Sequence, residues 1–423
     1  MSLHDVVRDL LPGVLSDLKD LVAIESVSAD QGRAGEVERS AVAIVRLLVD
    51  AGCPDARVVR ANGGAPAVIA RFPAPAGMPT VCLYAHHDVQ PEGDPAGWRT
   101  PPFVATEVED RLFGRGTSDD KGGFAVHLAA LRAFGGKPPV GVTLFIEGEE
   151  EVGSTDLAQL LEEHREELAA DVFVIADSGN WAVGKPAFTT SLRGLAGCTV
   201  EVRTLDHGVH SGEYGGVVPD ALTALCRLLA TLHDDQGNVA IAGLATAPAP
   251  ALEYPPERLR AESGLLDGVG WIGTGSFVER MWCKPAISVI ALDATPVDKA
   301  SNTLIPAARA KISARVAPGD DPGKALAALI THLKDHAPWG ARVTVSEGEA
   351  SEPSVIDFTG PYAEAARAAF TQAWGVEPVL IGQGGSIPMV ADFSQAFPDT
   401  TILITAVGDP DSRAHGANES LHL

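Results

Sequence analysis

Four glutamates lie within five positions of the stretch FIEGEEEVGS, which runs from Phe145 to Ser154. Carboxylates packed this closely repel one another and raise one another's pKa unless a positive charge lies among them. A solvated acidic loop would explain such a run taken alone, whereas a bound cation would explain why the run follows an apolar segment directly. The rest of the sequence has to decide between these two interpretations.

Other metal-binding residue types also follow apolar segments. Four segments are apolar throughout, namely TVCLY at 80–84, VTLFI at 142–146, VFVIA at 172–176 and TILIT at 401–405. The residues that come after or between these segments are His86, His87, Asp88, Asp119, Asp120, the glutamates, Asp177 and His415. In open α/β sheets ligands bind beyond the carboxyl ends of the strands. The four stretches after these segments and the stretch that carries Asp119 and Asp120 would thus deliver His, Asp or Glu to one edge. This pattern predicts a hydrolytic two-metal site.

Chemistry limits the roles that these side chains can take. Zinc accepts neutral imidazole and carboxylate ligands, and a catalytic site keeps one position open for water. On an extended chain His86 and Asp88 point to one side and His87 to the other, so that Asp88 can orient His86 while His87 is a bystander. A carboxylate such as Asp119 can bridge two cations, and a further carboxylate must take the proton from water. The adjacent glutamates could supply a ligand and this base.

Two kinds of strand must position these residues. Continuous apolar segments are typical of strands covered on both faces, so we expect an α/β fold with a mostly parallel sheet flanked by helices, one of them in GGFAVHLAALRAFGG at 122–136. The segments CTVEVR, AKISARV and RVTVSE, all between 198 and 347, alternate instead and predict an antiparallel sheet. We therefore predict an α/β domain from residues 1–187 and 384–423, with an α+β domain inserted at 188–383.

Composition excludes several classes of protein. A chain of 423 residues with 45% hydrophobic and 21% charged residues is typical of a globular protein with two domains, and its apolar runs are too short to span a membrane. The N-terminal stretch mixes charged and apolar residues, which predicts an amphipathic helix rather than a signal peptide. Five scattered cysteines favour free thiols in the cytoplasm. The net charge of −24 argues against a nucleic-acid partner.

The ordered set of motifs resembles a known group, the dinuclear zinc peptidases and deacylases. This group includes carnosine dipeptidases, cytosolic non-specific dipeptidases, aminoacylases and succinyl-diaminopimelate desuccinylase. HHDVQP resembles the family's H-x-D-V-x-P, GRGTSDDKGG its G-R-G-x-x-D-x-K-G, and EEVGS its E-E-x-G-S. HSGEYGG, SNTLIP, GGSIP and AHGANE follow in the family's order, so the resemblance runs nearly from end to end.

The resemblance implies a role for each residue of the metal site. His86 and Asp177 would bind one metal ion, Glu151 and His415 the other, and Asp119 would bridge them. Zinc is expected, although oxygen and nitrogen ligands also accept manganese or cobalt. In the same way, Glu150 would be the general base and Asp88 the support of His86, and the peptide bond between Asp119 and Asp120 is often cis in this family. Glu147 and Glu149 are expected to be structural or solvated.

The inserted domain would act as a lid and as a dimerisation domain. By resemblance to the dipeptidase branch, His210 of HSGEYGG reaches across a homodimer to the substrate carbonyl of the other subunit. Asn302 and Arg315 correspond to groups that hold the substrate carboxylate, for which the bidentate geometry of Arg is suited. The backbone of Gly385 and the side chain of Ser386, in GGSIP, should border the substrate.

Two features of the sequence bear on the substrate class. The position of Asp177 usually holds Asp in dipeptidases and Glu in deacylases, which favours a metal-dependent dipeptidase of unblocked dipeptides. Carnosinase-like members often carry Arg-Glu before GGSIP, whereas Gly382 and Gln383 stand here, which favours an N-acyl-amino-acid deacylase or desuccinylase on the same two-metal site. A third interpretation is a non-catalytic metal-binding dimerisation protein.

Overall fold

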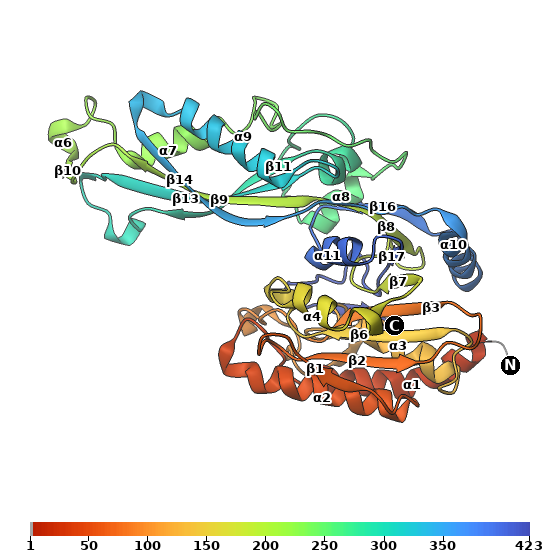
Figure 1. Cartoon of the computed structure of the whole chain (residues 1–423). Coiled ribbons are helices and arrows are strands. Elements are labelled where there is room, and N and C mark those ends of the chain that lie inside the picture. The colour runs from red at the N-terminus through yellow and green to blue at the C-terminus, as the bar shows by residue number, and fades with distance from the viewer. Residues whose placement is uncertain (1–2) are drawn as a thin grey trace. The chain divides into compact units, whose positions relative to one another are not determined.

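The computed structural model describes residues 3–423, whose chain divides into two units (Figure 1). Unit 1 comprises the chain up to Thr190 together with Ile356–Ile381 and Pro388–Leu423, and unit 2 comprises Ser191–Val355 and Gly382–Ile387. The predicted domain boundaries, 1–187, 188–383 and 384–423, remain a prediction. No helix in residues 3–423 is long and apolar enough to cross a membrane.

The largest sheet has nine strands, and its centre is parallel. Its order is β1-β2-β6-β3-β7-β17-β8-β15, with β16 paired to β8. The strands are β1 (Arg57–Val59), β2 (Ala67–Phe72), β3 (Thr80–His86), β6 (Gly141–Glu147), β7 (Val172–Ile175), β8 (Ala187–Leu192), β15 (Ser354–Val355), β16 (Val379–Gln383) and β17 (Thr401–Ile404). The four continuous apolar segments form β3, β6, β7 and β17, which pair in parallel as predicted. Their carboxyl ends therefore meet at one edge.

Helices cover both faces of this sheet, as predicted for an α/β fold. On one face α2 (Ala34–Asp50) and α3 (Lys121–Ala133) pack against Leu144 and Ile146 of β6. On the other face Phe145 of β6 meets Phe393 of α11 (Pro388–Ala396), with ring centroids 6.0 Å apart. Burial of one such side chain stabilises the fold by about 1.5–3 kcal/mol. Because successive side chains of a strand point to opposite faces of the sheet, Leu144 and Ile146 face one helix layer and Phe145 faces the other.

The remaining elements of unit 1 frame the ends of these strands. The helices are α1 (Leu3–Val22), α4 (Leu157–Glu163), α5 (Arg165–Leu168), α10 (Gly360–Trp374), η1 (Gln31–Arg33), η2 (Pro95–Gly97) and η3 (Glu150–Val152). A small antiparallel sheet has the order β18-β5-β4, from β18 (Ser420–His422), β5 (Arg111–Phe113) and β4 (Thr106–Val108). Because Ser420 pairs with Phe113, the C-terminal segment lies beside the loop that carries Asp119.

Unit 2 contains a four-stranded antiparallel sheet of order β11-β13-β9-β14. Its strands are β9 (Gly194–Arg203), β11 (Ala286–Asp293), β13 (Ala307–Val316) and β14 (Arg342–Ser351). The three alternating segments form β9, β13 and β14, as predicted. The sequence analysis did not identify β11, because its apolar residues stand at consecutive positions and most of them are exposed.

Two helices cover one face of that sheet, and short elements complete unit 2. Leu225 of α7 (Ala221–Ala230) and Leu329 of α9 (Pro322–Asp335) pack with Val200 and Ile312. Both helices begin at an aspartate N-cap, since Asp220 accepts from the Thr223 N–H and Asp321 accepts from the Lys324 N–H. The short elements are α6 (Ser211–Tyr214), α8 (Pro256–Ser263), β10 (Val209–His210), β12 (Thr303–Leu304), η4 (Glu279–Cys283), η5 (Val297–Lys299) and η6 (Pro338–Gly340).

Candidate metal centre

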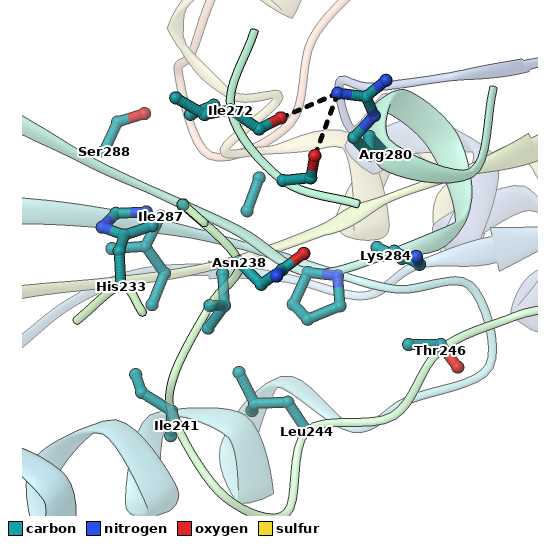
Figure 2. Close-up of a pocket in the computed structure, with 15 residues that line it drawn as sticks. His233, Asn238, Ile241, Leu244, Thr246, Ile272, Arg280, Lys284, Ile287 and Ser288 are labelled. Carbon is teal, nitrogen blue, oxygen red and sulfur yellow. Dashed lines mark hydrogen bonds between the residues drawn. The ribbon is translucent and has the colours of Figure 1, made fainter. Parts of the chain in front are cut away.

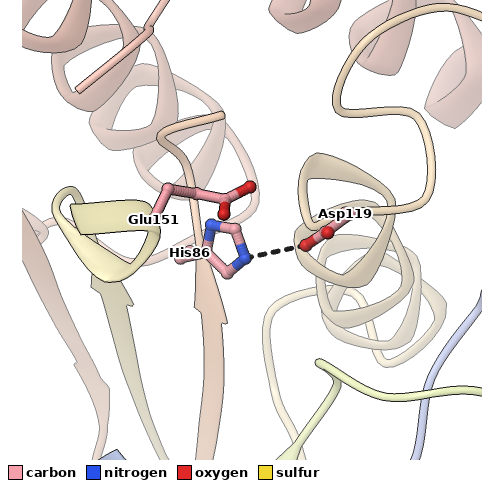
Figure 3. Close-up of side chains that lie close together, drawn as sticks. All are labelled: His86, Asp119 and Glu151. Atoms are coloured by element: carbon pink, nitrogen blue, oxygen red, sulfur yellow. Dashed lines mark hydrogen bonds and ion pairs between the residues drawn. The ribbon is translucent and has the colours of Figure 1, made fainter. Parts of the chain in front are cut away.

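Two histidines meet on opposite oxygens of one carboxylate in unit 1. His86 is the last residue of β3, and its Nε2 lies 3.1 Å from Oδ1 of Asp119 (Figure 3). Nε2 of His415 lies 3.0 Å from Oδ2 of the same carboxylate. Asp119 is thus placed as a bridging ligand must be, with one oxygen directed to each histidine.

The two remaining predicted ligands lie beside this arrangement. Oδ1 of Asp177 lies 3.9 Å from Nε2 of His86, and Oε2 of Glu151 lies 3.2 Å from Nε2 of His415. Asp177 follows β7 and Glu151 lies in η3, just beyond β6, so parallel strand ends bring these residues together. The structure therefore gathers all five predicted metal-binding residues at one edge of the sheet.

Glu150, the predicted base, also lies within reach of this group. Potential ligand atoms of His86, Asp119 and Glu151 lie within 4.8 Å of one another, and so do those of His86, Glu150 and Asp177. Imidazole nitrogens and carboxylate oxygens are donors that zinc, manganese and cobalt accept. The donor set therefore fits two divalent ions.

The electrostatics of the site also favour a cation. Burial and the charge of Asp177 raise the pKa of Glu150 well above 4.5. Burial likewise raises the pKa of Asp177 to about 7, with a further contribution from Asp119. Hydrogen bonds to Asp119 and Glu151 raise the pKa of His415 to about 11, so a proton is held where a cation would be stabilised. A metal ion would compete with this proton and relieve the repulsion between carboxylates.

Asp88 supports both His86 and the η3 turn. It is fully buried, its Oδ1 lies 3.3 Å from Nδ1 of His86, and its backbone carbonyl lies 3.1 Å from the same nitrogen. Its carboxylate also accepts from the backbone N–H groups of Glu150, at 3.3 Å, and Glu151, at 3.1 Å. The contact with His86 was predicted from the sequence, whereas the hydrogen bonds from the backbone of Glu150 and Glu151 were not.

Gln90 is a further supporting residue that the sequence analysis missed. Its Nε2 donates to Oε2 of Glu151 at 2.7 Å, and its backbone N–H donates to Oε1 at 3.2 Å. On an extended chain Gln90 shares a side with His86 and Asp88, and that alternation could have identified it. The segment HHDVQP therefore supplies three side chains to the centre.

The other acidic and imidazole groups of these motifs have structural partners. Nε2 of the buried His87 donates to the Pro66 carbonyl at 2.8 Å, and burial lowers the pKa of His87 to about 4. Glu147 accepts from Oη of Tyr84 at 2.7 Å, while Glu149 accepts from the Asp156 N–H at 2.6 Å. The peptide bond between Asp119 and Asp120 is cis, as the resemblance implies.

The predicted substrate-binding residues lie at two ends of the sheet in unit 2. His210 pairs with Thr303 between β10 and β12, and the Asn302 carbonyl accepts from the Ser211 N–H at 2.9 Å, which brings His210 and Asn302 together. Arg315 pairs with Leu195 near the far end of β13. Arg315 stands eight positions after Ala307, where β13 begins, a span of roughly 25 Å. In Figure 1, α6 and β10 mark the first end.

Arg193 ties the segment of Gly385 and Ser386 to the Arg315 end of the sheet. It stands just before β9, and its Nε donates to the Gly384 carbonyl at 3.0 Å. Burial and, to a smaller extent, the charge of nearby Arg315 together lower the pKa of Arg193 to about 10. Arg193 is a second residue that sequence reasoning missed. The structure thus brings Arg315, Gly385 and Ser386 to one end and His210 and Asn302 to the other.

A separate cavity of about 380 Å³ lies within unit 2 (Figure 2). Its lining includes Ile241, Leu244 and Ile287, and its Arg280 donates to the carbonyls of Ile272 and Gly273 at 2.8 and 3.3 Å. None of the predicted site residues lines it. Its size alone does not make it the functional site.

Comparison with known proteins agrees with the geometry of the centre. The model of "Peptidase family M20/M25/M40" matches residues 82–423. The "Cysteinylglycine-S-conjugate dipeptidase" of Corynebacterium striatum is 37% identical over 350 residues, which cover 81% of this chain and 77% of that relative. The "Beta-Ala-His dipeptidase" of Rattus norvegicus is 30% identical over 380 residues, which cover 84% of this chain and 76% of that protein.

A solved structure shows the same fold. The chain is similar to the di-peptidase Dug1p from Saccharomyces cerevisiae, with a TM-score of 0.84 and 26% sequence identity. The likeness covers 99% of this chain and 94% of that one. The α/β fold with its additional antiparallel sheet, as predicted from the sequence, is therefore confirmed.

Proposed function

Because the chain belongs to peptidase family M20/M25/M40, we propose that it is a metal-dependent dipeptidase that hydrolyses the peptide bond of unblocked dipeptides. The observation that carries this proposal is the position of Asp119, whose two oxygens lie 3.1 and 3.0 Å from the imidazoles of His86 and His415. The names of the relatives, which are dipeptidases, support the same reaction. The choice of unblocked dipeptides among the substrates of this family is supported by Asp177 and by these relatives.

Each predicted ligand has a role in this proposal. His86 and Asp177 would hold one divalent ion, Glu151 and His415 would hold the other, and Asp119 would be shared between them. We propose zinc as the metal, since the site offers imidazole and carboxylate donors, although manganese and cobalt accept the same donors. When bound, the two ions supply Lewis-acid polarisation of the scissile carbonyl and lower the pKa of a water molecule.

Glu150 is the general base in this mechanism. Its carboxylate lies near His86 and Asp177 in a buried position, and its raised pKa suits a group that accepts a proton and then releases it. Glu150 takes a proton from the attacking water and passes it to the leaving amine. Asp88 holds Glu150 through the backbone N–H of that residue, which fixes the base relative to His86.

We propose that the active protein is a homodimer. His210 and Asn302 lie at one end of the sheet in unit 2, while Arg315 and Ser386 lie at the other, roughly 25 Å along β13. One dipeptide cannot touch both ends of the same sheet. A partner chain that offers its His210 end would complete a site to which the first chain contributes Arg315.

A second candidate function keeps the metal centre and changes the substrate. Gln383 stands where carnosinase-like relatives often have a glutamate, and a neutral amide is poorly suited to bind a free amine. This favours an N-acyl-amino-acid deacylase, whereas Asp177 favours a dipeptidase.

We also propose a cytoplasmic location, because all five cysteines are free in the structure.

The variant Glu150→Gln tests the proposed mechanism. Replacing a general base should lower kcat by about 10²- to 10⁴-fold, while both metal ions stay bound because the five proposed ligands are unchanged. Steady-state kinetics and metal analysis by mass spectrometry measure the two effects. The matched control is Glu149→Gln, whose carboxylate accepts from the Asp156 N–H. Turnover close to that of the wild type would rule out Glu150 as the base, and loss of one ion would make it a ligand.

A further inference from the structure

Glu419 is a fully buried carboxylate that holds the loop carrying Asp119. Its side chain is 0% exposed. Its Oε1 accepts from the backbone N–H groups of Gly116, Ser118 and Asp119, at 3.0, 3.0 and 3.1 Å, and from Oγ of Ser118 at 3.2 Å. Its Oε2 accepts from the Gly116 N–H at 3.0 Å and from Nη1 of Arg115 at 2.7 Å. The loop thus folds around one carboxylate.

This arrangement is an anion-binding nest occupied by a side chain of the same protein. Successive backbone N–H groups that converge on one point favour negative charge, and hydrogen bonds to an ionised acceptor are the strongest class. The donor from Asp119 is the N–H of the proposed bridging residue itself. The position of the Asp119 backbone is therefore fixed directly by Glu419.

Arg115 extends this network to a third segment of the metal centre. It is 1% exposed, its Nη2 donates to the Pro91 carbonyl at 3.1 Å, and its guanidinium lies 5.4 Å from the centroid of the Trp98 ring. Pro91 ends the segment HHDVQP, which carries His86. One buried ion pair therefore joins the segments that carry His86, Asp119 and His415.

His415 depends on the same anchor. It stands four residues before Glu419, its φ is 63°, and its side chain is 60% exposed. Asn418 fixes the intervening turn, since its Oδ1 accepts from the Arg99 N–H at 2.7 Å and its Nδ2 donates to the Gly97 carbonyl at 2.8 Å. An exposed imidazole on a loop gains little from packing, so the buried residues after it must set its position.

We propose that the Arg115–Glu419 pair positions the bridging carboxylate of Asp119. This proposal rests on the proposed metal site. The pair sets Asp119 against His86 on one side and against His415 on the other. Glu419 touches neither substrate nor metal in this account, and it acts through the backbone of Asp119. Because displacements of about 1 Å can cost 10²-fold in rate, the pair is required for full turnover.

The variant Glu419→Gln tests this inference in the full chain. It keeps the side-chain volume but turns an amide NH₂ group toward N–H donors. We expect kcat and metal affinity to fall by about 10- to 100-fold with KM unchanged, and we expect the visible absorption spectrum of the cobalt-loaded protein to change. The matched control is Glu167→Gln on α5, which also removes a carboxylate that pairs with an arginine, Arg57, at 2.5 Å and should leave kcat and the spectrum unchanged.

The milder variant Ser118→Ala decides the matter if Glu419→Gln does not fold. It removes one hydrogen bond to Oε1, and we expect a smaller fall in kcat and a smaller spectral change in the same direction. A folded Glu419→Gln, or failing that Ser118→Ala, with wild-type kcat, metal affinity and cobalt spectrum would overturn the inference. A third variant, Asp119→Asn, separates the two proposals. If Asp119→Asn keeps full activity, the proposed metal site itself is wrong. If Asp119→Asn is inactive while Glu419→Gln behaves like the wild type, only the positioning role of Glu419 is ruled out.

Discussion

At the scale of single residues, neighbours in the sequence have different surroundings and so different chemistry. Glu147 hydrogen-bonds to Tyr84, and burial raises the pKa of Glu147 to about 7. Glu151 lies against His415 and Gln90, while Glu150 lies near Asp177. A cluster of like charges thus separates into a structural carboxyl, a proposed ligand and a proposed base.

Asp88 provides a test at this scale. The variant Asp88→Asn keeps the shape of the side chain, but its amide NH₂ must face the backbone N–H of Glu150 or Glu151. We expect the affinity for metal to fall by about 10- to 100-fold, because His86 and the η3 turn lose a common acceptor. Titration with a competing chelator measures this affinity. Unchanged affinity would show that Asp88 does not hold the centre.

The sequence predicted the gathering of the five proposed ligands better than it predicted their supports. His86 ends β3, and Glu151, Asp177 and His415 come after β6, β7 and β17, so the topology of a parallel sheet was enough to place them together. Glu419 was missed as a support because 300 residues separate it from Asp119. Gln90 was missed because an amide lacks the chemistry that draws attention to a ligand.

At the scale of elements, the buried parallel strands and the alternating antiparallel strands β9, β13 and β14 were predictable, whereas short or mostly exposed strands were not. Strands covered on both faces are apolar at every position, and this marked β3, β6, β7 and β17. The strand β1 has three residues and β15 has two, which is too short for a pattern to appear. The strand β11 is mostly exposed, so its apolar residues did not follow the expected alternation.

A buried histidine between α3 and β3 should affect the stability of the fold in acid. His127 of α3 is buried and donates from Nε2 to the Tyr84 carbonyl at 2.9 Å, and burial lowers the pKa of His127 to about 4. In the unfolded chain this pKa is about 6.5. As pH falls through this window the unfolded state binds the proton first, so the free energy of unfolding decreases.

The variant His127→Gln removes this titration and keeps a donor for the Tyr84 carbonyl. Between about pH 7 and pH 4, the metal-free wild type should lose about 3 kcal/mol more stability than the metal-free variant. Urea denaturation at several pH values gives the two curves. Parallel curves would mean that His127 does not titrate on unfolding in this range.

At the scale of the whole molecule, the proposed active site needs two chains to be complete. The Arg315 end and the His210 end of the sheet in unit 2 belong to different sites in this proposal. A two-fold dimer would present each end to the partner, as closed symmetric dimers do. A fully active monomer in light scattering at micromolar concentration would contradict it.

Mixing two inactive variants tests this directly. Neither His210→Ala nor Glu150→Gln should turn over on its own. In mixed dimers the His210→Ala chain has an intact Glu150 and receives His210 from its partner, so one of the two sites is complete. Random assortment of equal amounts should restore about a quarter of the wild-type activity. Activity that stays at the sum of the separate variants would show that His210 does not act between chains.

Dipeptidase activity is best measured as the release of free amino acid by the zinc- or manganese-loaded protein. The substrates are unblocked dipeptides, including Cys-Gly and β-Ala-His, beside their N-acetyl and N-succinyl counterparts, and Glu150→Gln is the blank. We expect the wild type to cleave the unblocked dipeptides preferentially and the variant to cleave none above background. Preferential cleavage of the blocked compounds would contradict it and assign the centre to a deacylase.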